Sequence, residues 1–114
     1  MEQACIFCKI RDGDIPSDVL YRDDSCFVIR DIAPKAPVHL LVIPTEHFTF
    51  LSNLDSSFRA ALGAMFEAAH LLAGREGVDE NGYRLIINQG ADAGQMIDHL
   101  HLHVLGGRAL GGMG

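Results

Sequence analysis

The most regular pattern in the chain is an alternation of histidine and aliphatic residues near its C-terminal end. His99, His101 and His103 stand two residues apart, with leucines between them. Successive side chains of a β-strand point to opposite faces, so this spacing places the three imidazoles on one face and the aliphatic side chains on the other. The segment 99–105 is therefore predicted to be a strand with one apolar face and one histidine-bearing face.

A period of three to four residues takes over in the middle of the chain and predicts one long helix over residues 54–72. Ser52 or Asp55 is suited to cap its start, and Gly74 or Gly77 its end. The apolar stripe of this helix is expected to cover one face of a sheet. The stripe consists of Leu54, Phe58, Leu62, Met65, Phe66, Ala69 and Leu72.

Four shorter apolar runs are bounded by turn-forming residues and have the length typical of strands. The first two predict a hairpin around Asp23 and Asp24. The runs cover residues 19–22, 25–30, 39–44 and 83–88. A short, partly amphipathic segment over residues 5–11 predicts one or two helical turns, which Gly13 ends. The expected fold is a single α+β domain over residues 1–114, with a mainly antiparallel five-stranded sheet, one long helix and one short helix.

Composition and charge narrow the functional classes. With 114 residues, 48% hydrophobic and 21% charged, the chain has the make-up of a soluble globular domain. Its net charge of −6 argues against a nucleic-acid surface, which needs clustered lysine and arginine, but not against a single bound nucleotide. The sequence shows neither an apolar run of bilayer-spanning length nor a secretory signal pattern, so no membrane contact and a cytoplasmic location are expected.

Three imidazoles in a row suggest a metal site, a nucleophile with helpers, or a solvated strand face. The outer pair is about 13 Å apart along an extended strand, so all three can hardly bind one ion, although two can. Imidazole has its ordinary pKa near neutrality and serves as a nucleophile or proton shuttle without large tuning. Attack on phosphorus would give a phosphoramidate-linked intermediate that water then hydrolyses. His101 is the natural nucleophile because it has a histidine on either side.

The segment 99–105 matches the signature His-φ-His-φ-His-φ-φ, in which φ is apolar, and the chain thereby resembles the histidine triad (HIT) family. Gln95 with its preceding glycine, and Gly106-Gly107-Arg108 after the triad, are similar to the Hint branch, the nucleoside phosphoramidases. Further similarity to this branch covers residues 6–10, 14–16 and 31–39. The resemblance therefore extends along nearly the whole chain.

This resemblance implies a HIT-like fold whose sheet continues across a homodimer. It implies hydrolysis of purine nucleoside phosphoramidates, such as adenosine 5′-phosphoramidate or AMP-lysine, through a covalent nucleotidyl-histidine. His101 would be the nucleophile, and His99 would orient it through its backbone carbonyl, while His103 and His39 would contact the phosphate or tune the site. The alternatives are a dinucleoside polyphosphate hydrolase of the Fhit type, a nucleotide-binding regulatory protein with incidental turnover, or a zinc-stabilised structural module.

The same resemblance implies two sets of binding residues. The phosphate and leaving group would be bound by Asn88, Gln95 and Met96. Because many relatives carry serine where Met96 stands, only a backbone N–H is expected to act at this position. Asp31 would bind both ribose hydroxyls, and apolar residues would enclose the base. The nucleoside-binding set is Ile6, Phe7, Ile10, Ile15, Ile29, Asp31 and Leu41.

Cys5 and Cys8 form a C-x-x-C pair, which is half of a tetrahedral zinc site or simply two small buried thiols. An odd count of three cysteines without a secretory signal indicates reduced thiols or metal ligands rather than a disulfide framework. By resemblance to some triad relatives, His47 and His99 would complete the site. The expected zinc ion is structural, and the chemistry needs no cofactor.

Overall fold

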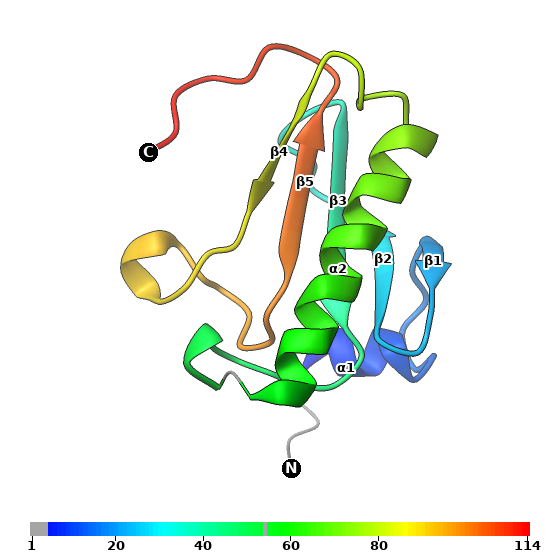
Figure 1. Cartoon of the computed structure of the whole chain (residues 1–114), viewed down its shortest axis with the longest axis vertical. Helices are drawn as coiled ribbons and strands as arrows, with labels where there is room; N and C mark the ends of the chain where they lie inside the picture. Colours follow the sequence, from blue (N-terminus) through cyan, green and yellow to red (C-terminus); the bar gives the residue numbers. More distant parts are fainter. Residues whose placement is uncertain (1–4, 54) are drawn as a thin grey trace.

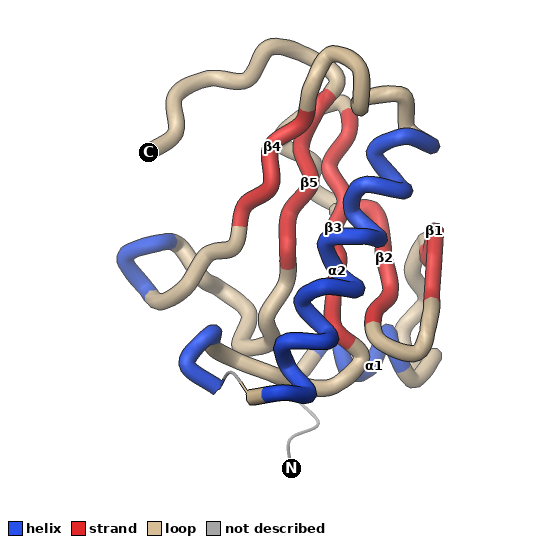
Figure 2. The backbone as a smooth tube through the Cα atoms, viewed as in Figure 1, coloured by secondary structure: helices blue, strands red, loops and turns tan. Residues whose placement is uncertain are grey.

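The computed structural model describes residues 5–53 and 55–114 and shows an antiparallel five-stranded sheet with a helix on each face (Figure 1; Figure 2). The strand order is β1-β2-β3-β5-β4, and every neighbouring pair is antiparallel. The strands are β1 (Val19–Arg22), β2 (Cys26–Arg30), β3 (Val38–Pro44), β4 (Tyr83–Ile86) and β5 (Leu102–Gly106). The predicted α+β fold with one long and one short helix is confirmed. Two parts of the predictions lie outside the described residues: Leu54, which was predicted in the helix stripe, and residues 1–4 of the predicted domain.

The turn between β1 and β2 is closed by one carboxylate. Asp23 Oδ1 accepts hydrogen bonds from the backbone N–H groups of Ser25 and Cys26, at 2.7 and 2.9 Å. Aspartate favours turns because its short side chain satisfies nearby backbone donors in this way. The hairpin around Asp23 and Asp24 is thus confirmed, and the second strand begins at Cys26, one residue later than predicted.

The long helix is α2 (Ser56–Arg75), which begins one residue after Asp55. The Asp55 side chain accepts a hydrogen bond from the Phe58 N–H at 2.9 Å, so Asp55 rather than Ser52 is the cap. Its buried side chains pack on the sheet at Phe58, Met65, Ala68, Ala69 and Leu72. Phe66 was predicted in this stripe but is 44% exposed, because each helical residue turns about 100° from its neighbour and Met65 already faces the sheet.

The predicted alternation in the histidine segment is present, but the strand is shorter than expected. Leu100, Leu102 and Val104 are buried in the cluster beneath α2, whereas the histidines face the other side of the sheet. Strand β5 begins only at Leu102, so His99 and His101 precede it. The neighbouring strand β3 ends at Pro44, which has no N–H to continue the ladder and whose carbonyl oxygen accepts a hydrogen bond from the His99 ring instead.

The short helix α1 (Ile6–Arg11) lies on the sheet face opposite α2. Phe7 and Ile10 pack there against apolar side chains of β2 and β3, namely Phe27, Ile29, Leu41 and Ile43. This cluster covers only one end of the face and leaves the part over β3, β5 and β4 open. Within residues 5–53 and 55–114, no helix has both the length and the apolar character needed to cross a membrane.

Candidate active site

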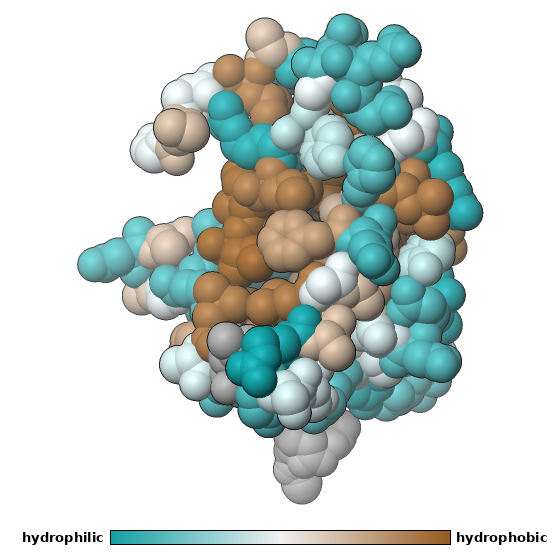
Figure 3. Space-filling model, viewed as in Figure 1, coloured by the Kyte–Doolittle hydropathy of each residue, from teal (hydrophilic) through white to brown (hydrophobic). Residues whose placement is uncertain are grey.

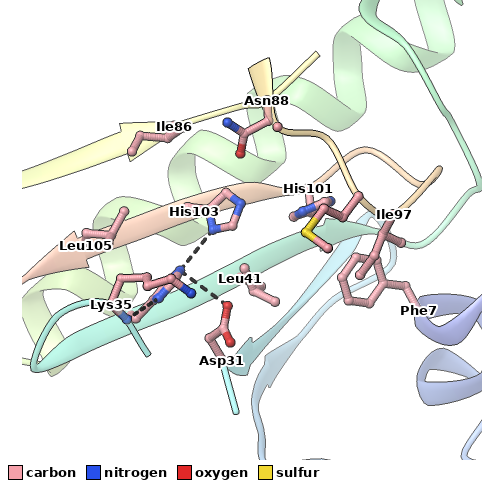
Figure 4. Close-up of a pocket in the computed structure, with 13 residues that line it drawn as sticks. Phe7, Asp31, Lys35, Leu41, Ile86, Asn88, Ile97, His101, His103 and Leu105 are labelled. Carbon is pink, nitrogen blue, oxygen red and sulfur yellow. Dashed lines mark hydrogen bonds and ion pairs between the residues drawn. The ribbon is translucent and has the colours of Figure 1, made fainter. Parts of the chain in front are cut away.

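A cavity of about 490 Å³ occupies the open part of this sheet face (Figure 4). This size is typical of small-molecule sites. Strands β3, β4 and β5 form its floor, and side chains from α1 and two loops form its walls. The lining residues are Phe7, Asp31, Lys35, His39, Leu41, Ile86, Asn88, Gly94, Met96, Ile97, His101, His103 and Leu105. Two of the three triad histidines thus meet in one cavity.

His101 is held in a single tautomer. Its Nδ1–H donates to the backbone carbonyl oxygen of His99 at 2.8 Å, the contact that the family resemblance implied. The Phe7 ring packs edge-on against the imidazole, with ring centroids 5.0 Å apart. A neutral imidazole protonated at Nδ1 keeps a lone pair at Nε2. The residue therefore offers a nucleophilic nitrogen at the cavity wall.

The His103 ring lies beside His101, with ring centroids 5.0 Å apart, and forms a hydrogen-bonded pair with His39 (Figure 4). The backbone N–H of Lys35 donates to His39 Nδ1 at 3.0 Å, so the ring proton of neutral His39 sits on Nε2. That nitrogen lies 2.9 Å from His103 Nδ1 and 3.4 Å from Asp31 Oδ2. His103 Nδ1 accepts, so the proton of His103 is on Nε2, where it can be donated to a ligand.

Burial keeps both of these imidazoles neutral. It lowers the pKa of His103 to about 4, with a further contribution from the nearby His101 and His39. Burial also lowers the pKa of His39, against the opposing effect of the Asp31 carboxylate. At neutral pH the pair acts through N–H donors rather than through positive charge.

The predicted phosphate-binding residues lie in different environments. Asn88 lines the cavity, and its Nδ2 donates to the Ala93 carbonyl at 2.7 Å. Met96 also lines the cavity and is 91% exposed. Gln95 is outside the lining; its Oε1 accepts from the Gly90 N–H at 2.8 Å and its Nε2 donates to the Ile97 carbonyl at 3.2 Å. Gln95 therefore holds the shape of the loop that precedes the triad.

Of the predicted nucleoside-binding residues, too, some line the cavity and others do not. Phe7, Asp31 and Leu41 line the cavity. Ile10 and Ile29 are buried in the cluster beneath α1, where Ile15 packs against them. Ile6 is 42% exposed and lies outside the lining. The structure thus places three of the seven residues at the cavity surface, and three others pack behind the cavity wall.

Four lining residues were not singled out from the sequence. Ile86 and Leu105 share the histidine-bearing sheet face, and strand alternation continued from His103 would have found Leu105. Lys35 and Ile97 come from loops, where no periodicity marks the direction of a side chain. They reach the cavity only through the tertiary fold.

His99 lies apart from the cavity, in a second cluster with Cys5, which caps α1, with Cys8 within α1, and with His47. Cys5 Sγ and Cys8 Sγ are 3.3 and 3.6 Å from His99 Nδ1, and Cys8 Sγ is 3.3 Å from His47 Nδ1. Tetrahedral zinc with ordinary bond lengths separates sulfur and nitrogen ligands by about 3.6 Å. The spacing of this cluster therefore fits one zinc ion.

The surroundings of His99 agree with a role as a metal ligand. Its Nε2–H donates to the Pro44 carbonyl oxygen at 2.9 Å, which leaves the Nδ1 lone pair facing the thiols. Such a hydrogen bond to the far nitrogen is the usual way in which a ligating imidazole is oriented. The ring is fully buried, and burial lowers its pKa to about 4, so it is neutral as a ligand must be.

Comparison with known proteins identifies the family of this chain. The model of the HIT domain family matches residues 12–110. The chain belongs to the HIT family. This HIT protein is 43% identical over 113 residues to the purine nucleoside phosphoramidase of Escherichia coli K12, covering 99% of this chain and 95% of that relative.

Two solved HIT structures share its fold closely. A HIT family hydrolase from Clostridium thermocellum superposes with a TM-score of 0.93 at 42% identity, covering 99% of this chain and 98% of the other. A histidine triad protein from Clostridium difficile gives a TM-score of 0.92 at 36% identity, covering 100% and 99%. The family predicted from the signature at residues 99–105 is thereby confirmed.

Proposed function

We propose that this HIT protein hydrolyses purine nucleoside phosphoramidates to a nucleoside monophosphate and an amine. The observation that carries the proposal is the tautomer of His101, whose Nδ1–H is bound to the His99 carbonyl and whose Nε2 is free in the cavity. The similarity to a purine nucleoside phosphoramidase over almost the full chain supports the same reaction.

The reaction follows from the positions of the histidines. His101 Nε2 attacks phosphorus, the phosphorus–nitrogen bond of the substrate breaks, and the leaving amine takes up a proton from a water molecule in the open cavity. The Nε2–H of His103 donates to a phosphate oxygen as negative charge develops there, with His39 behind it. Water then attacks the phosphorus of the nucleotidyl-histidine and loses a proton to the solvent, the bond between phosphorus and His101 Nε2 breaks, and the nucleotide is released.

The nucleoside would lie between Phe7, Ile97 and the aliphatic floor at Leu41, with its ribose beside Asp31. Asp31 Oδ1 already accepts a hydrogen bond from the Ala33 N–H at 2.8 Å, so Oδ2 is the oxygen available to the ribose hydroxyls. The walls around the base are apolar. The cavity would therefore favour the large purine bases through their contact area, and it would distinguish little between individual purines.

We also propose that Cys5, Cys8, His47 and His99 hold a structural zinc ion. Bound there, zinc would join the N-terminal end of α1 to the loop after β3 and to the segment before β5. Its contribution would be to stability, since the cluster stands apart from the cavity lining. A homodimer and a cytoplasmic location remain predictions from the sequence and the family resemblance.

The decisive experiment for the function compares wild type with His101→Ala on adenosine 5′-phosphoramidate. The wild type should release AMP and ammonia, and rapidly quenched protein should carry an adenylyl group on His101 by mass spectrometry. The variant should show neither. A wild type that binds AMP but releases none from the phosphoramidate would instead identify a nucleotide-binding protein.

A further inference from the structure

The turn that follows β5 contacts the loop that precedes β3, although about 70 residues separate them in sequence. Arg108 Nη2 donates to the backbone carbonyl of Lys35 at 3.0 Å, and its Nη1 donates to the carbonyl of Ala109 at 2.9 Å. One guanidinium group therefore connects the two segments. A planar guanidinium directs its donors rigidly, so this arrangement fixes the position of the Lys35 carbonyl.

Gly107 brings the same two segments into close contact. It has a φ of +96°, and a Cβ added to it would lie 2.9 Å from Pro37 Cβ. Only glycine adopts this backbone conformation readily and leaves room for the proline. The pairing of Gly106 with Val38 completes the junction, so the loop 31–37 rests directly on the turn after β5.

The backbone of Lys35 is also the group that determines the tautomer of His39. Its carbonyl accepts from Arg108, while its N–H donates to His39 Nδ1 at 3.0 Å. This donor requires a lone pair on Nδ1 and therefore a proton on Nε2, which lies 2.9 Å from His103 Nδ1. A continuous series of hydrogen bonds thus runs from an exposed arginine to the cavity.

We propose that Gly107 and Arg108 are positioning residues that hold the Lys35 backbone against His39, and thereby keep His103 in the tautomer that presents an N–H to the cavity. The consequence for the rate rests on the proposed function. The consequence for the two imidazoles does not, because it concerns the protein without substrate. Neither residue lines the cavity, so each acts only through the loop.

The test measures imidazole tautomers and turnover in the same variants. Two-bond ¹H–¹⁵N spectra of histidine-labelled wild type should show His39 and His103 protonated at Nε2 alone. In Arg108→Ala and in Gly107→Ala, His39 should become a mixture of tautomers. The value of kcat/KM for adenosine 5′-phosphoramidate should fall on the order of tenfold, mainly through kcat, because the N–H of His103 acts in the transition state.

Two control variants match these changes elsewhere on the surface. Arg22→Ala removes a guanidinium that also donates to a distant backbone carbonyl, that of Arg11 at 3.4 Å. Gly111→Ala adds a methyl group at a glycine where nothing lies within 4 Å of the new Cβ. Both controls should keep wild-type tautomers and rates.

The outcomes separate the two proposals. If Arg108→Ala and Gly107→Ala keep wild-type tautomers at His39 and His103, the positioning role is wrong. If their tautomers change while wild type hydrolyses no phosphoramidate, the positioning role stands and the proposed function fails. Because Arg108 is exposed, its removal leaves the core intact and the comparison interpretable.

Discussion

The Nδ1–H of His101 donates to the backbone carbonyl oxygen of His99 at 2.8 Å, so the first histidine of the triad acts on the second through its main chain. The His99 side chain points to a different cluster, with Cys5, Cys8 and His47. One short segment thus contributes to two sites: its backbone orients the proposed nucleophile, and its imidazole belongs to the proposed zinc site.

This arrangement predicts a large loss of activity in His101→Ala. Without the His101 imidazole, kcat should fall on the order of a thousandfold or more, because no other described side chain presents a nucleophilic nitrogen at the same place in the cavity. Binding of AMP, measured by calorimetry, should change little, since Asp31 and the apolar walls remain. Near-wild-type turnover in this variant would disprove the assignment of the nucleophile.

Asp31→Asn tests recognition of the ribose. The amide keeps an oxygen for the Ala33 N–H, so the loop should retain its shape. Loss of the charged acceptor should lower kcat/KM for an adenosine phosphoramidate by about tenfold. The loss should be much smaller for the corresponding 2′,3′-dideoxy substrate. An equal loss on both substrates would contradict a contact between Asp31 and the ribose.

The low pKa of His103 predicts a loss of stability in acid. Burial lowers this pKa from an ordinary value of 6.5 to about 4 in the folded protein. Between these two pH values the unfolded chain binds the proton and the folded protein does not. The contribution of His103 to the free energy of unfolding is therefore complete above about pH 6.5 and is lost as the pH falls towards 4. From pH 7 to pH 5 this one group should contribute a loss of about 2 kcal/mol.

Urea denaturation of chelator-treated protein at these two pH values measures the effect. His99 has a similarly lowered pKa and should add a loss of its own. In His103→Gln the difference between pH 7 and pH 5 should therefore shrink without vanishing. An unchanged difference would mean that His103 does not change its pKa on folding.

The cluster of Cys5, Cys8, His47 and His99 predicts bound zinc. Elemental analysis of protein purified without chelator should give up to one zinc per chain. Cys5→Ser should reduce the zinc content and lower the melting temperature by at least about 4 °C. Cys26→Ala is the control: Cys26 is a free thiol buried in the other core cluster, and its removal should leave the zinc content unchanged. Metal-free protein with an unaltered melting temperature would leave Cys5 and Cys8 as ordinary buried thiols.

The sequence was sufficient for the features that depend on short-range periodicity. Alternation assigned Leu102 and Val104 to the core and His103 to the opposite face, and the helical period located α2. It could not distinguish Leu41 from Ile43, which stand on the same face of β3. Both pack in the cluster beneath α1, but only Leu41 also lines the cavity, because a helix about 35 residues away in the chain covers one end of this sheet face and not the other.

Local sequence patterns also could not predict the contact between Lys35 and Arg108. Their contact joins a loop and a turn that lie 73 residues apart in the sequence, and neither segment has a periodicity that fixes side-chain direction. His99 illustrates the same limit. Its spacing groups it with the other triad histidines, but its ring lies in another cluster, with the thiols of Cys5 and Cys8.

The open edge of the sheet predicts a homodimer. Strand β4 is last in the strand order and, among residues 5–53 and 55–114, is paired on one side only, by β5. Helix α2 lies beside it where His70 Nδ1 is 3.1 Å from the Tyr83 hydroxyl. Phe66, one turn earlier on α2, is 44% exposed, and Figure 3 shows apolar side chains gathered over α2, β4 and β5. Unpaired strand edges and exposed apolar areas are commonly covered by another chain, and a second copy related by a two-fold axis would cover both at once.

Analytical ultracentrifugation at micromolar concentration should therefore report roughly twice the 12.4 kDa mass of the chain. Phe66→Asp should shift the protein towards monomer, because it places a charge in the apolar area without touching the core. Val19→Asp introduces the same charge at a comparably exposed apolar position on β1, the opposite edge of the sheet, and should remain dimeric. A wild type that sediments as a monomer at these concentrations would show that the edge of β4 is left uncovered.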